Sequence, residues 1–239
     1  MNREATLSSL LDQTFTELSD SRRMVAIFLA IWIPITAVSG YFQGGRSDFD
    51  VGFGFGFQLT ESLLAQGVLA VVAVIGAAIA GLLLSYWLYA ALVGRTTAPG
   101  FGRFWPWLGI YILYLLGIMF GLVLLIVPGL ILGVRWAMAL PLVVGSRLPA
   151  MDTFGESWEK TRGRSWSIFG SFVILVIGVA VFNAIMGSLA VLLGGPGSIG
   201  GLLLLAIGDG VSAAIFTALP VAIYRLLHNN TDELAEVFE

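Results

Sequence analysis

Six long apolar stretches constrain the fold of this 239-residue chain more than any other feature of its sequence. A helix needs about 20 apolar residues to cross the roughly 30 Å hydrocarbon core of a bilayer. Helices have to carry such stretches, because backbone polar groups in lipid need internal hydrogen bonds. The predicted spans cover residues 24–43, 63–94, 104–127, 129–147, 165–193 and 200–228.

The fold class that follows is an all-α, polytopic membrane protein with six transmembrane helices in three hairpins. Strands of a membrane barrel would alternate in polarity over about ten residues, whereas these stretches are apolar throughout. Apolar residues make up 58% of the chain and charged residues 11%, less than half of the roughly 25% in a soluble domain. This composition excludes a soluble enzyme, a nucleic-acid-binding protein and a disordered chain.

The basic residues orient the chain, because cytoplasmic loops of membrane proteins are enriched in Lys and Arg. With the N- and C-termini in the cytoplasm, every Lys and Arg except Arg46 and Arg135 lies on the inner side. The outer loop 44–62 is acidic. The first 23 residues are polar, and the apolar stretch after them is long enough to remain as an anchor. We therefore expect a multi-pass protein of a bacterial cytoplasmic (inner) membrane, without a cleaved signal peptide.

The membrane domain is expected to extend over 24–228 and to be followed by a cytoplasmic tail, 229–239. One amphipathic element precedes this domain, and a second lies within it. Residues 1–23 predict a helix at the inner interface, and residues 149–162 predict a second one, in which Glu156 can pair with Lys160. The apolar face of the first helix consists of Leu7, Leu10, Leu11, Phe15 and Leu18.

The last two hairpins share short motifs. Residues 102–109 and 163–170 both read Gly-Arg-x-Trp-x-x-(Leu/Phe)-Gly, and Ala-Leu-Pro occurs at 139–141 and again at 218–220. We interpret these hairpins as parallel repeats about an axis along the membrane normal. The alternative is that any inner boundary of a membrane collects Gly, Arg and Trp.

Two segments carry a family resemblance. Residues 128–144 contain Arg135-Trp136 and Pro141, and residues 154–166 contain the pattern Ser-Trp-x-x-Thr-x-Gly-x-x-Trp. Over about 128–170 the chain resembles the YciC-like bacterial membrane proteins and the membrane domain ahead of some glycerophosphoryl diester phosphodiesterases. An acidic residue often found after the proline helix is replaced by Gly145-Ser146-Arg147. The resemblance implies no phosphodiesterase activity, because the catalytic barrel and its metal ligands are missing.

The sequence offers little for catalysis. It has no cysteine and one histidine, His228, so it predicts no metal site, no cofactor and no nucleophile–base pair. The glycine-rich segment 52–57 lacks the Lys-Ser/Thr of a phosphate-binding loop. It fits an aromatic anchor in the headgroup region or a cover over an outer cavity. Glycines within spans, such as Gly117 and Gly121, fit close helix packing.

Polar residues within three spans are the most informative. At 1.5 Å per residue, Arg135, Asp209 and Asn183 lie about 9, 13 and 15 Å from the outer ends of their spans. An unpaired charge there costs about 2.5–3.5 kcal/mol even on the lenient insertion scale. We therefore predict that Arg135 faces Asp209 inside the bundle, with Asn183 close by. The group is either a structural ion pair or an outward-opening anion site or proton-pathway step.

The function that we expect is contact with membrane lipids or with a partner protein, without catalysis. The partner is either another membrane protein or a second copy of the chain. The docking surface is the inner face around 149–166, which suits phospholipid headgroups. Alternatively, these residues only hold the topology, or the chain transports a small anionic solute through the Arg135, Asp209 and Asn183 group. The residues expected on the docking surface are Trp158, Lys160, Arg162, Arg164 and Trp166.

Overall fold

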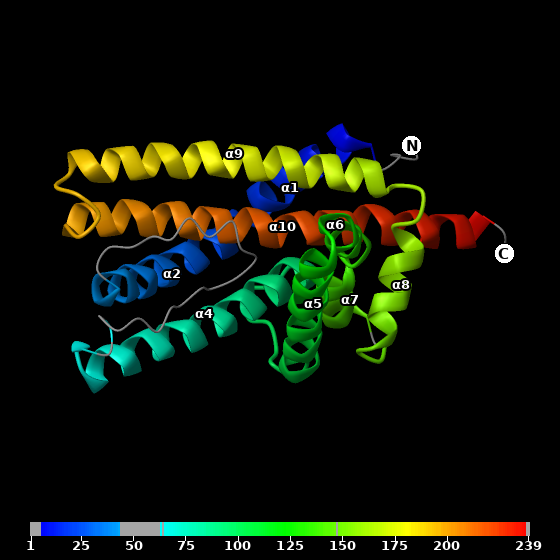
Figure 1. Ribbon diagram of the computed structural model, residues 1–239. Helices are drawn as coiled ribbons and strands as arrows, with labels where there is room; N and C mark the ends of the chain where they lie inside the picture. Colours follow the sequence, from blue (N-terminus) through cyan, green and yellow to red (C-terminus); the bar gives the residue numbers. More distant parts are fainter. Residues whose placement is uncertain (1–5, 44–62, 64, 147, 238–239) are drawn as a thin grey trace. The chain divides into compact units, whose positions relative to one another are not determined.

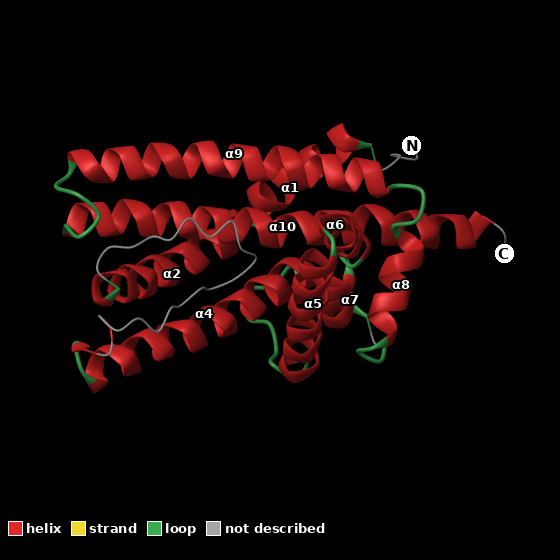
Figure 2. Ribbon diagram, in the orientation of Figure 1, coloured by secondary structure: helices red, strands yellow, loops and turns green. Residues whose placement is uncertain are grey.

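The computed structural model describes residues 6–43, 63, 65–146 and 148–237. All regular elements in these residues are helices, so the all-α fold class is confirmed (Figure 2). Figure 1 labels them along the chain. They are α1 (Leu7–Asp20), α2 (Arg22–Phe42), α4 (Val68–Gly94), α5 (Phe104–Leu124), α6 (Ile126–Arg135), α7 (Ala139–Gly145), α8 (Asp152–Lys160), α9 (Ser165–Leu192) and α10 (Ile199–Val237).

Six segments of the described chain are long and apolar enough to cross a membrane, as the sequence predicts. Their mean hydropathy lies between 1.8 and 2.7. The cytoplasmic position of the two termini stays a prediction. The outer loop 44–62, with Arg46 and the glycine-rich segment 52–57, lies outside the described residues, and so does Arg147. The six segments are Arg22–Phe42, Val68–Gly94, Phe104–Leu124, Ile126–Gly145, Ser165–Leu192 and Ile199–Leu227.

The chain divides into two compact units. The first unit contains residues 1–21, 89–174 and 217–239, and therefore α1, α5, α6, α7 and α8 in full. The second unit contains residues 22–88 and 175–216, and therefore α2 in full. Helices α4, α9 and α10 each contribute residues to both units.

In the first unit, α5 and α6 form a tight antiparallel hairpin. Leu125, with φ −161° and ψ 137°, is the one residue between them. The two backbones approach so closely that a Cβ on Gly121 would lie 2.8 Å from the Cα of Gly129. Small residues therefore permit the contact, as predicted for span packing.

The turn between the third and fourth spans lies earlier than the sequence suggests. The spans expected at 104–127 and 129–147 place the turn at Pro128, but α6 already begins at Ile126. Proline fits there because the first N–H groups of a helix have no intrahelical acceptor. A helix continuing from α5 would instead lose a bond at Pro128 and clash with the carbonyl four residues earlier.

The fourth span, predicted over 129–147, is found at Ile126–Gly145, but it consists of two short helices and not one. A turn at residues 136–138 separates α6 from α7. Pro141 again explains the position of the break, since a helix restarted at Ala139 places the proline within its first turn. The matching Pro220 lies inside the uninterrupted α10, so the two Ala-Leu-Pro motifs differ in structure.

Helix α1 is packed through a partly polar face. The side chain of Thr6 caps its first turn by accepting a hydrogen bond from the backbone N–H of Ser9. Leu10, Thr14 and Glu17 are buried, whereas Phe15 is exposed. The sequence placed Phe15 on the apolar face and the acidic residues opposite, so the face that the protein covers differs from the one expected.

In the second unit, small residues again allow close helix packing. Gly210 of α10 lies under α2, where an added Cβ would be 2.9 Å from Leu29 and 3.1 Å from the ring of Trp32. Trp32 also packs against Phe28, with ring centroids 4.9 Å apart. These contacts fix α2 against the part of α10 that contains Asp209.

Candidate functional site

The break between α6 and α7 is bridged by one hydroxyl group from α8. Ser157 is fully buried, and its Oγ donates to the backbone carbonyl of Arg135 at 2.7 Å. The same oxygen accepts from the backbone N–H of Met138 at 3.2 Å. In a continuous helix, Arg135 O would bond to the N–H of Ala139, which here bonds to Trp136 O at 2.9 Å. Ser157 thus replaces both backbone partners that the break removes.

Thr161 lies one helical turn beyond Ser157 and faces the same break. It is fully buried, and its Oγ1 lies 3.4 Å from the carbonyl oxygen of Arg135 and 2.8 Å from that of Ser157. Residues four apart share one face of a helix. Ser157 of α8 and Thr161, the C-cap of that helix, are therefore both directed at the end of α6.

The side chain of Arg135 stacks on Trp158. Its Cζ lies 5.1 Å from the centre of the indole ring, and Nη1 donates to the Trp158 carbonyl at 3.4 Å. Such a cation–π contact is worth about 0.5–1 kcal/mol at an exposed site. The motif residues Ser157, Trp158 and Thr161 thus all contact Arg135. Their spacing in the motif is the spacing that these contacts require.

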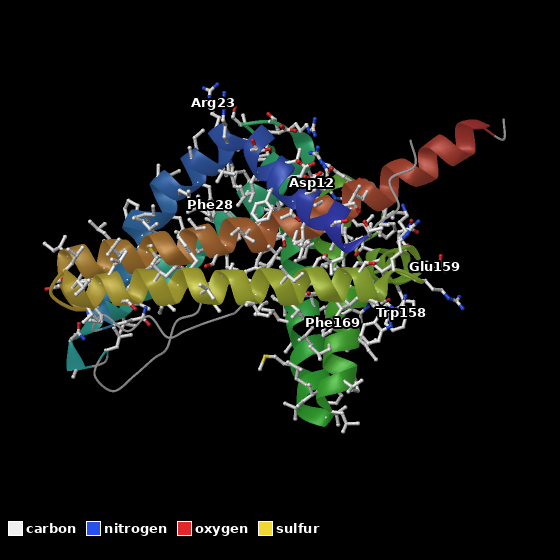
Figure 3. The ribbon with its side chains drawn as sticks, turned by 90° about the horizontal axis from the view of Figure 1, so that it is seen from above. Asp12, Arg23, Phe28, Trp158, Glu159 and Phe169 are labelled. Carbon is white, nitrogen blue, oxygen red and sulfur yellow. The ribbon has the colours of Figure 1, made fainter. Side chains whose placement is uncertain are left out.

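Aromatic and basic side chains continue along the chain from this contact. Trp158 is 40% exposed and Trp166 is 85% exposed, and Trp166 meets Phe169 edge to face. Figure 3 labels Trp158 at the end of α8 and Phe169 on α9. We call the segment from α8 to the first turn of α9, residues 152–168, the α8–α9 surface.

The basic residues of the α8–α9 surface differ in their pairing. Lys160 Nζ lies 3.1 Å from Glu156 Oε1, which confirms the predicted pair. Arg162 is exposed and Arg164 is half-buried. Among the described residues, neither arginine has an acidic partner within ion-pair distance. Two positive charges on this surface are therefore available to an external anion.

An apolar groove lies next to the Arg135–Trp158 contact. It has a volume of about 780 Å³, and Trp136, Met151 and Phe154 form one side of it. The rings of Trp136 and Phe154 lie 4.6 Å apart. Gly117 of α5 lies directly against the ring of Trp136 and leaves no room for a Cβ. The other side consists of the α5 residues Leu113, Leu116, Gly117, Met119, Phe120 and Val123.

The second unit holds the other two polar residues singled out in the spans. Trp32 Nε1 donates to Asp209 Oδ2 at 2.8 Å, and Asn183 Nδ2 donates to Ser212 Oγ at 2.9 Å. Asn183 Oδ1 also touches Gly208, the residue before Asp209. The structure thus places Asn183 and Asp209 on neighbouring parts of one unit.

Arg135 belongs to the first unit, with Trp158 as its partner there. Its predicted pairing with Asp209 stays a prediction. The aromatic partners, Trp158 for Arg135 and Trp32 for Asp209, were not anticipated from the sequence. Indole rings at helix spacing read as apolar packing, and nothing in the local pattern distinguishes a stacking or donating tryptophan.

Sequence reasoning also missed a buried ionic cluster in the first unit. Glu17 of α1 is fully buried, with its Oε1 3.2 Å from Arg225 Nη1 and 3.8 Å from Arg95 Nη2. Gln13 donates to the same oxygen at 2.8 Å. Arg225 also donates to the Leu92 carbonyl at 2.6 Å, in the last turn of α4. The only sequence signal for the burial of Glu17 was its position seven residues after Leu10, on the same face of α1.

The second oxygen of the Glu17 carboxylate is buried, and no described residue hydrogen-bonds to it. Within the described residues, no three His, Asp or Glu side chains lie close enough together to hold a metal ion.

Comparison with known families gives a match within the membrane-spanning part of the chain. Residues 102–206 match the family described as the membrane domain of glycerophosphoryl diester phosphodiesterase. The resemblance seen in the sequence over about 128–170 is thereby confirmed and extended. The matched region is less than half of the chain and includes α5 to α9, with Arg135, Ser157, Trp158 and Thr161. No curated protein and no solved structure matches the chain.

Proposed function

We propose that this protein is a non-enzymatic, lipid-binding membrane protein, and that its α8–α9 surface holds anionic phospholipid headgroups at the inner leaflet. The observation that carries the proposal is the combination of exposed Trp158 and Trp166 with Arg162 and Arg164, which have no acidic partner within the described part of the chain. The family match supports a membrane domain but names no ligand for it.

The chemistry of the surface suits a phosphate at the membrane boundary. Guanidinium groups bind phosphate oxygens through two parallel hydrogen bonds. Tryptophan rings prefer the headgroup level of a bilayer, because they are apolar with one polar N–H. Each basic residue near an anionic membrane surface contributes about 1 kcal/mol of attraction. Lys160 contributes less, because Glu156 already balances its charge.

The proposal is tested by the lipids that remain bound to purified protein. Protein reconstituted in equal phosphatidylglycerol and phosphatidylcholine is released into detergent, and the retained lipids are measured by native mass spectrometry. The wild type is expected to retain phosphatidylglycerol preferentially. The double variant R162Q/R164Q removes about 2 kcal/mol of attraction, so the preference is expected to fall by about tenfold or more.

The matched control is R22Q/R23Q, which neutralises two exposed arginines at the start of α2. Figure 3 labels Arg23 on that helix. This control is expected to keep most of the preference, although the sequence predicts the same membrane side for Arg22 and Arg23. Equal losses in the two double variants, or no loss in R162Q/R164Q, would contradict the proposal.

A second candidate function is transport of a small anionic solute. The broken fourth span favours it, because transporter sites are commonly formed by discontinuous helices. Against it, Ser157 already bonds the backbone groups that the break releases. Flux of a small organic anion into proteoliposomes, abolished by Arg135→Met but kept in R162Q/R164Q, would establish transport. No flux above protein-free liposomes would exclude it.

A further inference from the structure

The apolar groove and the Arg135–Trp158 contact both lie in the first unit. Trp136 forms part of the groove wall, and Arg135 precedes it in the chain. Met151, Phe154 and Trp158 are spaced three and four residues apart, so they share one face of α8. Trp158, which contacts Arg135, therefore lies one helical turn beyond the groove residue Phe154 on the same face.

We infer that this groove holds one acyl chain of an anionic phospholipid whose phosphate is bound by Arg135 and Arg162 next to Trp158. The inference rests on the proposed function and adds to it the chain-binding part of the site. It requires Arg135 to lie at the headgroup level of the inner leaflet, and not about 9 Å from the outer end of its span as the sequence predicts. It assigns a role to nine groove residues, of which only Phe154 also belongs to the α8–α9 surface.

The lining of the groove suits a hydrocarbon chain. Its volume of about 780 Å³ lies within the usual range for small-molecule sites, roughly 300–1,000 Å³. Met119 and Met151 are flexible thioethers at opposite sides, and such side chains adapt to a variable apolar ligand. Gly117 lets the Trp136 ring lie against the α5 backbone, so the ring forms a flat wall rather than filling the space.

Charge complementarity favours a phospholipid over a partner helix as the occupant. Apolar surface alone gives little driving force for helix association in lipid, since the tails that it displaces are equally apolar. A cation at one end of the groove adds a preference for an amphiphile with an anionic head. Arg135 is half-buried and already held by Trp158, so binding a phosphate there requires little further ordering of its side chain.

The test is photo-crosslinking with phosphatidylglycerol that carries a diazirine in its acyl chain, using the full-length protein in nanodiscs. Labelled peptides are mapped by mass spectrometry. Labelling is expected to concentrate on residues 113–123 and 151–154. The variant M119W fills the groove and is expected to reduce this labelling several-fold. The control I112W lies on the same helix, is exposed and does not line the groove, so it is expected to leave labelling unchanged.

The outcomes separate this inference from the proposed function. Labelling that spreads evenly over the exposed apolar faces, or that M119W does not reduce, overturns the groove assignment, while the headgroup preference measured with R162Q/R164Q still stands. Equal labelling by a choline analogue overturns the assignment of an anionic lipid. Thermal unfolding of M119W and I112W, expected to match the wild type, confirms that both variants are folded.

Discussion

The hydroxyl group of Ser157 is the single side-chain group that bridges the break between α6 and α7 on both sides. Ser157 stabilises a backbone break that proline imposes, because it supplies an acceptor and a donor where the helix lacks both. Side-chain bonds of this kind satisfy the backbone groups that an irregular stretch leaves without partners. The same residue belongs to the segment in which the sequence resembles a known membrane-domain family. Its role is thus to hold α8 and α6 together at the proposed site.

Ser157→Ala is expected to lower the free energy of unfolding by about 1–3 kcal/mol, because it leaves the Met138 N–H without its acceptor and the Arg135 carbonyl with only the longer contact to Thr161. Ser188→Ala is the control, since that hydroxyl is exposed and bonds only within its own helix. The control is expected to change stability by less than about 0.5 kcal/mol. Thermal unfolding in detergent measures both. Equal effects in the two variants would mean that Ser157 does not support the break.

Helix α1 shows at the element scale how an ionic cluster can attach a terminal segment. Glu17 connects α1 to Arg225 of α10 and to Arg95, which follows the end of α4. Arg225 in turn caps the last turn of α4 through Leu92. An amphipathic helix that only rested on lipid would not bury a carboxylate. The cluster therefore indicates that α1 is an integral part of the first unit.

Glu17→Gln is expected to destabilise the protein by about 3 kcal/mol, because breaking a buried pair leaves the other charge uncompensated. The double variant E17Q/R225M is expected to recover part of this loss, since apolar replacement of a buried pair is often neutral. Glu156→Gln is the control for an accessible pair and is expected to cost less than about 1 kcal/mol. Limited proteolysis should also cut within residues 7–20 faster in E17Q. Unchanged unfolding and proteolysis would show that α1 docks without Glu17.

At the scale of the whole molecule, hydropathy and periodicity are enough to predict the six spans and the absence of strands from the described residues. They cannot predict the break after Arg135. A local pattern does not reveal that Ser157 of α8 hydrogen-bonds to the Arg135 carbonyl and the Met138 N–H, which the break leaves without helical partners. They also misplace the turn at Leu125, since Pro128-Gly129 resembles a turn as much as a first helical turn. The candidate site was predicted through its exposed residues but not through its buried ones.

The exposed residues were predictable and the buried ones were not, because their contacts differ in how far apart the partners lie in the sequence. Trp158, Arg162 and Trp166 lie close together in the sequence, so their common surface follows from the chain itself. The groove instead combines α5 with Trp136, in the turn after α6, and with Met151 and Phe154 at the start of α8. Glu17 and Arg225 are separated by almost the whole chain. Pairings of this kind depend on tertiary packing, which a single sequence does not encode locally.

The central claim is that the α8–α9 surface binds an anionic headgroup, and a density map of the protein in phosphatidylglycerol nanodiscs tests it most directly. The claim predicts phosphate density within hydrogen-bonding distance of Arg162, beside the Trp158 ring, and loss of that density in R162Q/R164Q. Ordered phosphatidylglycerol elsewhere on the protein, with no density at Arg162, would contradict it.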